Sequence, residues 1–341
     1  MRVGPRRRIC VPLLVIGLSF GLAGFSTSRP AGEPAMHARA SGALDGDFAD
    51  PFVLRAGGGY YAFATGAHGS HLQVATSRDL AVWTPEGDPL PALPVWAAPG
   101  PGFTWAPAVL TRASGYVLYY TTRDRASGFQ CISRATADRP GGPYVDRSAQ
   151  PLVCQTSGTA ALCGSIDPSP FLDADGTPYL LWKSDENSRA CRTAPRIWAQ
   201  RLSADGLALV GGAPHALIAR DRDWEGDIVE APSMIRRGDA YYLFYSANWY
   251  GSSAYAIGYA VCTSPTSGCR KMSSAAPLVA SADSILGPGG QELFTDGDGA
   301  LWMAYHAWTA PHTSYQAGGA RRLRLARIDF GVDGQPIASA R

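Results

Sequence analysis

The chain has 341 residues, of which only 17% are charged, and it contains 39 glycines and 26 prolines, a composition that suits a protein with many tight turns. Its formal net charge is +2, but loss of residues 1–40 would remove six arginines and one glutamate and leave −3. A mildly acidic domain lacks the basic surface that binds nucleic acid, so we exclude that class of partner.

The first forty residues are predicted to be a secretory leader and not part of the fold. Four arginines lie within the first eight residues, and residues 9–25 form an apolar stretch that is short for a membrane span. Cleavage is predicted near Ser26 or as late as Ala40, with an uncleaved N-terminal anchor as the alternative. We therefore expect residues 41–341 to form the mature, secreted protein, with no membrane attachment once the leader is removed.

A phrase made of a strand, a turn and a second strand occurs five times in the rest of the chain. Each copy runs from a head residue through an apolar stretch to a glycine-containing turn, and then into an aromatic-rich stretch. The heads are Asp50, Trp105, Asp167, Glu230 and Gln291. Successive heads are 55, 62, 63 and 61 residues apart, which indicates one structural unit used five times.

A unit of about sixty residues has room for the recurrent hairpin and two further strands. The turns are of the hairpin kind, as at Asp175-Gly176 and Asp298-Gly299, and no long segment has a helical period. Five units of four antiparallel strands predict an all-β fold, a five-bladed β-propeller that forms one domain. A β-sandwich is the main alternative, but sandwiches lack a fivefold internal period.

Six cysteines follow the leader, and an even number in an exported chain predicts disulfides. The predicted pairs are Cys131–Cys154, Cys163–Cys191 and Cys262–Cys269. The last pair closes a short turn, CTSPTSGC, that is rich in Ser, Pro and Gly. Zinc bound by cysteine is disfavoured, because no group of Cys and His has finger or ribbon spacing.

Three of the five heads, Asp50, Asp167 and Glu230, are carboxylates. A turn before a proline would explain each of them singly. If the heads occupy equivalent places in a propeller, however, all three converge on one central funnel, where a purely structural design would avoid like charges. Crowded carboxylates have divergent pKa values, so one can stay protonated while another is ionised. Glycoside hydrolysis requires this division between an acid and a base or nucleophile.

The repeated motifs resemble glycoside hydrolase family 43, whose members are inverting five-bladed propellers that act on arabinose- and xylose-containing plant polysaccharides. The similarity extends from about Asp45 to Pro336 and lies in ADPFVLRAGGGYYAFAT, TWAPAVL, GSIDPSPFLDADGTPYLLWK, VEAPSMIRRGDAYYLFYSANWY and LWMAYHAW. It implies that Asp50 is the general base and Glu230 the general acid. Asp167 would then be the third acid, which orients the general acid and tunes its pKa.

The resemblance implies three further site residues. Trp105 matches an aromatic wall beside the sugar, although packing between blades explains this residue equally well. His306 in AYHAW matches a histidine below the active site that forms the pocket floor or helps to hold a water-coordinated calcium ion; a core histidine is the alternative. Arg321 falls where the family has an arginine that reaches the sugar or the general acid, with Arg322 as the register alternative. No cofactor is expected to be required, and a structural calcium ion is left open.

These motifs predict a secreted, monomeric, inverting glycoside hydrolase of plant polysaccharides or oligosaccharides, either an α-L-arabinofuranosidase or a β-xylosidase. An endo-α-1,5-L-arabinanase is an alternative, because it would use the same three acids, and residues 85–102 and 185–195 are expected to form the rim loops that select the sugar. A non-catalytic carbohydrate-binding propeller, with Trp105 and Trp249 stacked on sugars, would not need the acids. A related propeller hydrolase of fructose polymers is disfavoured by the W-A-P and E-A-P contexts.

Overall fold

The computed structural model describes Leu44, residues 46–155, residues 163–187, Cys191 and residues 194–340. The predicted leader, residues 1–40, and both predicted cleavage sites lie outside the described residues. Within the described part, no helix is long and apolar enough to cross a membrane. The regular structure there consists of strands and of two single-turn 3₁₀ helices, η1 (Asp223–Glu225) and η2 (Tyr315–Ala317).

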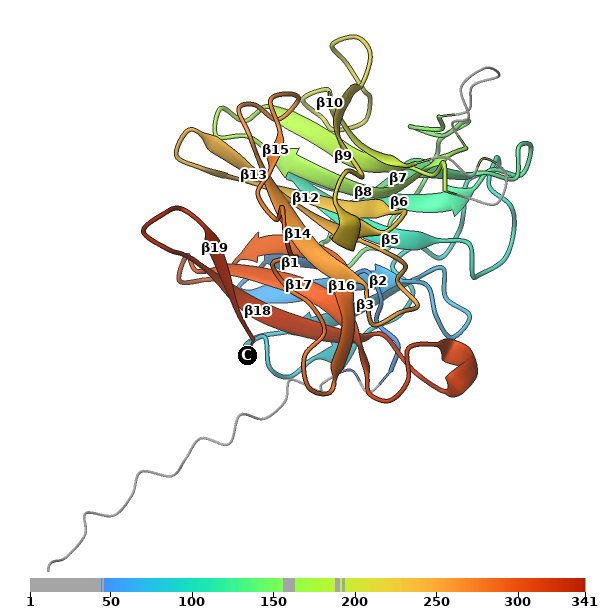
Figure 1. Ribbon diagram of the computed structural model, residues 1–341. Helices are drawn as coiled ribbons and strands as arrows, with labels where there is room; N and C mark the ends of the chain where they lie inside the picture. Colours follow the sequence, from blue (N-terminus) through green and yellow to red (C-terminus); the bar gives the residue numbers. More distant parts are fainter. Residues whose placement is uncertain (1–43, 45, 156–162, 188–190, 192–193, 341) are drawn as a thin grey trace, which may run out of the picture. The chain divides into compact units, whose positions relative to one another are not determined.

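Five antiparallel sheets follow one another along the chain, and we number them as blades 1 to 5 (Figure 1). Blade 1 contains β1 (Phe52–Ala56), β2 (Gly59–Thr65), β3 (Leu72–Ser77) and β4 (Thr84–Pro85). Blade 2 contains β5 (Trp105–Arg112), β6 (Gly115–Arg123) and β7 (Gln130–Ala137). Blade 3 contains β8 (Ser165–Leu172), β9 (Pro178–Ser184), β10 (Arg196–Arg201) and β11 (His215–Ala219). Blade 4 contains β12 (Val229–Arg237), β13 (Ala240–Ala247), β14 (Ala256–Cys262) and β15 (Arg270–Lys271). Blade 5 contains β16 (Ile285–Thr295), β17 (Leu301–Thr309), β18 (Arg322–Phe330) and β19 (Pro336–Ala340).

The predicted five-bladed β-propeller is confirmed. The first strand of each blade contacts the first strands of its neighbours, so β1, β5, β8, β12 and β16 surround the axis. The expectation of four strands in every blade is wrong for blade 2 as far as the structure describes it, because between β7 and residue 155 there are only isolated bridges, at Val145 and Val153. The segment after β7 contains the sequence Pro-Gly-Gly-Pro at residues 140–143, and proline cannot donate to a strand ladder.

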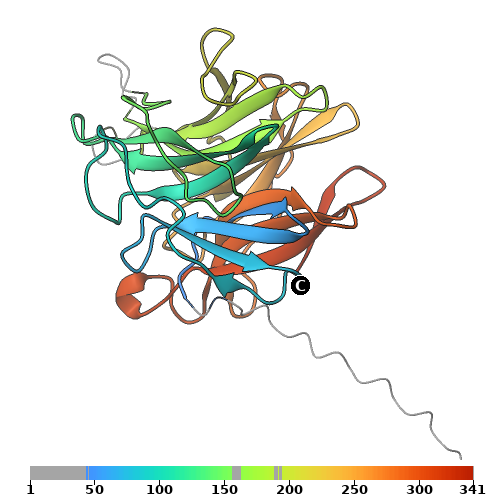
Figure 2. The ribbon, with the colours of Figure 1, turned by 180° about the vertical axis from the view of Figure 1, so that it is seen from behind.

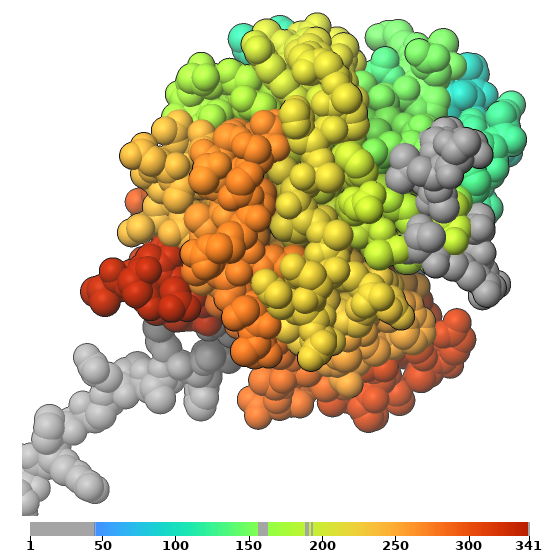
Figure 3. Space-filling view, turned by 45° about the horizontal axis from the view of Figure 1, so that its top comes forward, coloured from blue at the N-terminus to red at the C-terminus, as the bar shows by residue number. Residues whose placement is uncertain are grey.

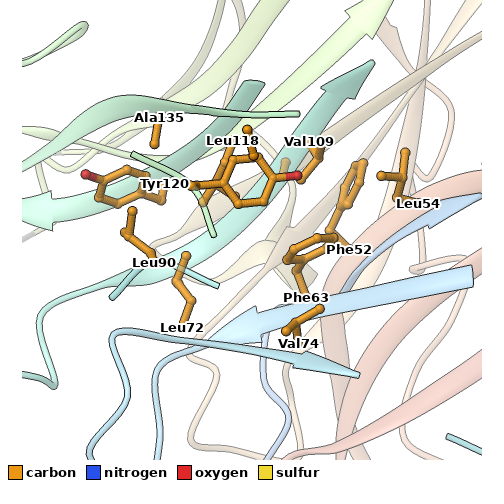
Figure 4. Close-up of a cluster of buried hydrophobic side chains, with 13 residues drawn as sticks. Phe52, Leu54, Phe63, Leu72, Val74, Leu90, Val109, Leu118, Tyr120 and Ala135 are labelled. Atoms are coloured by element: carbon orange, nitrogen blue, oxygen red, sulfur yellow. The ribbon is translucent and has the colours of Figure 1, made fainter. Parts of the chain in front are cut away.

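Each pair of neighbouring blades has its own apolar cluster. Adjacent residues of one strand point to opposite faces of the sheet, so Val109 packs toward blade 1 while Leu110 packs toward blade 3. Figure 4 shows the cluster between blades 1 and 2, in which Phe63 of β2 faces Leu118 and Tyr120 of β6. The period-2 pattern of the sequence is therefore the pattern of the contacts between blades.

The ring closes between blade 5 and blade 1. Phe48 and Val53 pack against Leu323 and Leu325, and the backbone N–H of Phe48 donates to the carbonyl of Arg321 at 2.7 Å. Figure 2 shows the blue strands of blade 1 beside the orange and red strands of blade 5, and Figure 3 shows the yellow segments between green and orange neighbours. Among the described residues no sheet combines strands from both chain ends, so side-chain packing and single hydrogen bonds close the ring.

The three predicted disulfides are confirmed. Cys131 of β7 is bonded to Cys154, which lies in the segment after β7. Cys163, just before β8, is bonded to Cys191, between β9 and β10. Cys262 is bonded to Cys269 and closes the turn between β14 and β15.

A left-handed residue lies at or near the start of the innermost strand in blades 1 to 4 and in the middle of β16 in blade 5. These residues are Asp50 (φ 51°), Ala106 (φ 44°), Asp167 (φ 55°), Ala231 (φ 49°) and Gly290 (φ 60°). In blades 2 to 5 the register to the second strand shifts at this point, which marks a bulge. The five predicted heads are therefore not equivalent, because Trp105 and Glu230 precede the left-handed residue and Gln291 follows it. Pro51, Pro107, Pro168 and Pro232 directly follow the left-handed residue in blades 1 to 4, so alignment of the motifs on this proline would have revealed the offset.

Candidate active site

A cavity of about 570 Å³ lies at the ends of the innermost strands. Five of the predicted site residues line it, namely Asp50, Trp105, Asp167, Glu230 and Arg321. A larger hollow of about 820 Å³ lies on blade 1, beside Asp79 and Glu86. The carboxylate of Asp79 bonds to the backbone of its own turn and that of Glu86 bonds to Thr76, so this hollow lacks a group of carboxylates directed at one point. The smaller cavity is therefore the candidate active site.

Asp50 enters the cavity from blade 1 and is surrounded by donors. Its Oδ2 accepts the hydroxyl of Thr65 at 2.6 Å, and its Oδ1 lies 3.4 Å from Nη1 of Arg321. Burial lowers the pKa of Arg321, but Asp50, Tyr315 and Asp47 together raise it more, so the guanidinium stays charged. Arg321 is fixed in turn by Tyr315, whose hydroxyl accepts from Nε at 2.7 Å, and by the ring of Tyr250. Thr65 and Arg321 thus hold the two oxygens of the Asp50 carboxyl group in place.

His306 lies beneath Asp50 and is fully buried. Its Nδ1 accepts the backbone N–H of Asp50 at 3.0 Å, which assigns the ring proton to Nε2. Burial, with a smaller contribution from Arg321, lowers the pKa of His306 well below its usual range, so the ring is neutral. The histidine thus supports Asp50 from the floor of the cavity.

The residues around His306 do not fit a calcium ion coordinated by the protein. Calcium takes six to eight oxygen ligands, whereas His306 offers a nitrogen. In the described ranges, no group of three or more His, Cys, Asp or Glu residues is arranged to hold a metal ion.

Glu230 enters the cavity from the start of β12 in blade 4. Its Oε2 accepts from Nζ of Lys183 at 3.0 Å, and its Oε1 accepts the hydroxyl of Tyr255 at 2.9 Å. Lys183 lies at the end of β9 with only 1% of its side chain exposed, and it also lies 3.4 Å from Oδ1 of Asp185. Burial lowers the pKa of Lys183, but the charges of Glu230 and Asp185 raise it more, so the ammonium is retained.

Asp167 enters from blade 3, and its Oδ2 accepts the backbone N–H of Ala231 at 3.0 Å. Burial and, next in size, the negative charge of Glu230 raise the pKa of Asp167 to about 8, against the opposing effect of Lys183. At neutral pH the Asp167–Glu230 pair therefore retains a proton, while Asp50 on the other side of the cavity is paired with Arg321.

Two consecutive glycines in β16 make room for this arrangement. A Cβ atom at Gly289 would lie 2.0 Å from the ring of Tyr255, and one at Gly290 would lie 2.5 Å from the ring of His306. The rings of Tyr255 and His306 stack with their centroids 5.8 Å apart. The sequence analysis singled out the neighbouring Gln291, which is buried and bonds to Ser246 and to the carbonyl of Ala231.

Lys183 and Tyr255 are site residues that were not predicted from the sequence. A lysine within the apolar run YLLWKS was a usable signal, because the corresponding strands of the other blades have a hydroxyl residue or a histidine there. Tyr255 carried no such signal, because it reaches Glu230 from the segment before β14. The predicted rim loops contact the cavity only at Gly102, Asp185 and Asn187 among the described residues, whereas the aromatic rim comes from Trp249, Tyr250 and Tyr315.

A propeller with an acid pair and a separate, cation-paired carboxylate around one cavity is the arrangement of a glycoside hydrolase. The model of the glycosyl hydrolases family 43 matches residues 42–336. The chain therefore belongs to this family of inverting glycoside hydrolases, as its motifs predicted.

Known proteins of this kind are similar over most of the chain. The crystal structure of a thermostable family-43 glycoside hydrolase superposes with a TM-score of 0.75 at 31% identity and covers 86% of this chain and 92% of that one. The arabinan endo-1,5-alpha-L-arabinosidase A of Aspergillus niger is 29% identical over 279 residues, which are 75% of this chain and 81% of that protein. A putative beta-xylosidase of Xylanibacter ruminicola is 27% identical over 198 residues, 57% of this chain, and the match spans only 33% of that protein.

Proposed function

We propose that this protein hydrolyses glycosidic bonds in arabinose- or xylose-containing plant polysaccharides or oligosaccharides, with inversion at the anomeric carbon. One observation carries the proposal. Asp50 and Glu230 face the same cavity from blades 1 and 4, and the two carboxylates have different charged neighbours, Arg321 for one and Lys183 with Asp167 for the other.

In this proposal Asp50 is the general base. Its side chain is held by Thr65 and Arg321 and takes a proton from the water that attacks the anomeric carbon. Glu230 is the general acid and protonates the departing glycosidic oxygen, through a transition state that resembles an oxocarbenium ion. The reaction consumes one water, and it leaves the proton on Asp50 and the negative charge on Glu230.

Asp167 is the third acid, and it influences whether the general acid Glu230 holds its proton. The sequence suggested that an anionic Asp167 keeps Glu230 protonated by repulsion between like charges. The raised pKa of Asp167, about 8, makes the relation mutual, because an anion on either carboxyl strengthens proton binding on the other. Below that pH the pair holds a proton for the leaving group.

The sugar is proposed to be the terminal arabinofuranose or xylose of a chain, as in an α-L-arabinofuranosidase or a β-xylosidase. Trp105, Trp249 and Tyr250 would then contact the sugars through their rings. An endo-α-1,5-L-arabinanase is the second candidate, supported by the identity with the A. niger arabinan endo-1,5-alpha-L-arabinosidase.

Chromatography of the products from arabinan, arabinoxylan and xylo-oligosaccharides tests the function and the choice of sugar. Release of a single pentose from the start of the reaction is expected for exo action, whereas a ladder of oligosaccharides would establish endo action. An Asp50→Asn variant is the matched control for contaminating enzymes. Binding of these sugars without any product would overturn the proposal in favour of a non-catalytic carbohydrate-binding propeller.

We also propose that the enzyme is secreted, acts as a monomer and needs no added cofactor. The three disulfides support secretion, because such bonds persist in oxidising compartments.

A further inference from the structure

A set of hydrogen bonds joins successive blades just below the cavity. In four cases the backbone N–H of a left-handed residue donates to a side chain of the preceding blade. The donor–acceptor pairs are Ala106–Thr65 at 3.0 Å, Asp167–Thr121 at 3.2 Å, Gly290–Ser246 at 2.9 Å and Asp50–His306 at 3.0 Å. Each acceptor is a hydroxyl or a neutral imidazole at the end of the second strand of its blade.

The junction between blades 3 and 4 departs from this pattern because Lys183 occupies the acceptor position. Lys183 pairs in register with Ile166, as Thr121 pairs with Trp105 and Ser246 with Glu230. An ammonium group has no lone pair to accept a hydrogen bond. The N–H of Ala231 therefore donates to the carboxyl of Asp167 instead, at 3.0 Å.

The lysine is costly for the fold at this position. Its side chain is 1% exposed, and a buried charge is unfavourable unless it is paired and hydrogen-bonded. A threonine or serine would close the junction without that cost, as at the other hydroxyl junctions. The fold therefore does not require the charge of Lys183, and we look for its role in the cavity.

The groups around the ammonium are mostly acidic. Glu230 from β12 lies 3.0 Å away, and Asp185 from the segment after β9 lies 3.4 Å away. Asp167 from β8 and Glu186 also interact electrostatically with Lys183. On the far side of Glu230 stand Tyr255 and, beyond it, His306 and Asp50 with its partner Arg321.

We infer that Lys183 is a positioning residue for the general acid, which holds Oε2 of Glu230 and stabilises the carboxylate left when Glu230 has given its proton to the leaving oxygen. This inference rests on the role proposed for Glu230. As the glycosidic C–O bond breaks, the proton moves to the leaving oxygen and a negative charge develops on Glu230, next to the ammonium. The ammonium group attracts this developing negative charge at a distance of 3.0 Å, and the carboxyl group of Asp167 opposes it.

The pH dependence of kcat/KM in Lys183→Ser and Lys183→Met variants tests this role. Serine restores the hydroxyl found in blade 4, and methionine keeps the length of the side chain without its charge. Loss of a positive charge this close should raise the pKa of the acid, so the basic limb should move up by about one to three pH units. The acidic limb should stay in place, because Asp50 keeps Arg321 and Thr65. A basic limb at the wild-type pH in either folded variant would overturn the inference.

The leaving group provides a second readout. A weaker general acid should slow the departure of a sugar, whose hydroxyl oxygen must be protonated, more than that of p-nitrophenol, which departs with little protonation. We therefore expect the Lys183 variants to lose more kcat/KM on an oligosaccharide than on the matching p-nitrophenyl pentoside. Equal losses on both substrates would indicate a purely structural lysine and contradict the inference.

A Lys271→Met variant is the matched control, because Lys271 is also buried and paired with a glutamate but lies outside the cavity. It should lose stability without a shift of either limb. Absence of hydrolysis by the wild-type protein would overturn the proposed function and this inference together. A normal wild-type profile with unshifted Lys183 variants would overturn only the inference.

Discussion

Two buried lysines each pair with a glutamate, and the difference between the two pairs shows what distinguishes an active-site carboxylate from a structural one. Lys271 of β15 lies 2.7 Å from Glu225 of η1 and 2.8 Å from Asp221. Glu225 is fully buried and also accepts from the hydroxyl of Tyr245 and from two backbone N–H groups. All of its acceptor sites are directed at donors, so Glu225 fastens the segment before β12 to Lys271 and Tyr245 of blade 4.

Glu230 has the same kind of partner but different surroundings. Its side chain opens onto the cavity, its donors are Lys183 and Tyr255, and Asp167 adds a second carboxyl. Here the carboxyl groups outnumber the nearby cations, so a proton is retained where a substrate can reach it. A lysine–glutamate contact alone therefore does not define function. What distinguishes Glu230 is the excess of carboxyl groups over cations around it and its access to the cavity.

The largest effect is expected from removal of the acid or the base. Asp50→Asn and Glu230→Gln preserve shape but cannot accept and donate the required protons. Each should lower kcat/KM by about 10²–10⁴-fold or more on a sugar leaving group, with little change in Tm. Steady-state kinetics and thermal melting measure both quantities, and near-normal turnover by either variant would rule out the proposed roles.

Loss of the structural pair should act on stability. In Lys271→Met the buried carboxylate of Glu225 loses its cation, which should cost about 3–5 kcal/mol of the free energy of unfolding. Urea unfolding monitored by tryptophan fluorescence measures this cost. A variant that is as stable as the wild type would show that the contact between Lys271 and Glu225 does not stabilise the fold.

A third glutamate extends the comparison, because its hydrogen-bond partners in the described structure include no lysine or arginine. Glu292 of β16 accepts from the hydroxyl of Ser233 at 2.6 Å, and burial raises its pKa to about 8. The folded state therefore binds a proton that the unfolded state releases near pH 4.5, so stability should fall as pH rises from 5 to 8. The predicted change is about 3 kcal/mol.

Glu292→Gln, which keeps the contact with Ser233, should flatten this part of the stability profile. Urea unfolding at pH 5 and at pH 8 measures the difference between variant and wild type. Parallel profiles for the two proteins would mean that Glu292 is ionised in the folded state at neutral pH.

The sequence was sufficient for the propeller and for most of the cavity wall, and the reasons are physical. The repeat and the alternation of apolar residues dictate which strand faces meet, and they place Asp50, Asp167 and Glu230 around the same cavity. The offset between Glu230 and the two aspartates was overlooked although the sequence contains it, because the proline comes directly after Asp50 and Asp167 but two residues after Glu230.

Contacts of single side chains within a blade or between neighbouring blades were beyond the reach of such patterns. Tyr255 meets Glu230 only because Gly289 leaves space for its ring, and nothing in the spacing of these residues indicates their approach. Lys183 was accessible in principle, because a comparison of the five second strands reveals it as the cation among hydroxyl and imidazole residues. The aromatic rim of Trp249 and Tyr315 comes from connections whose conformation depends on packing.

Proton NMR of the first sugar released tests most directly whether Asp50 activates water opposite the acid Glu230. With a p-nitrophenyl pentoside that the enzyme hydrolyses, the anomer opposite to that of the substrate should appear first, and the other anomer only later by mutarotation. First appearance of the substrate's own anomer would contradict these roles, because retention requires a carboxylate that attacks the sugar itself.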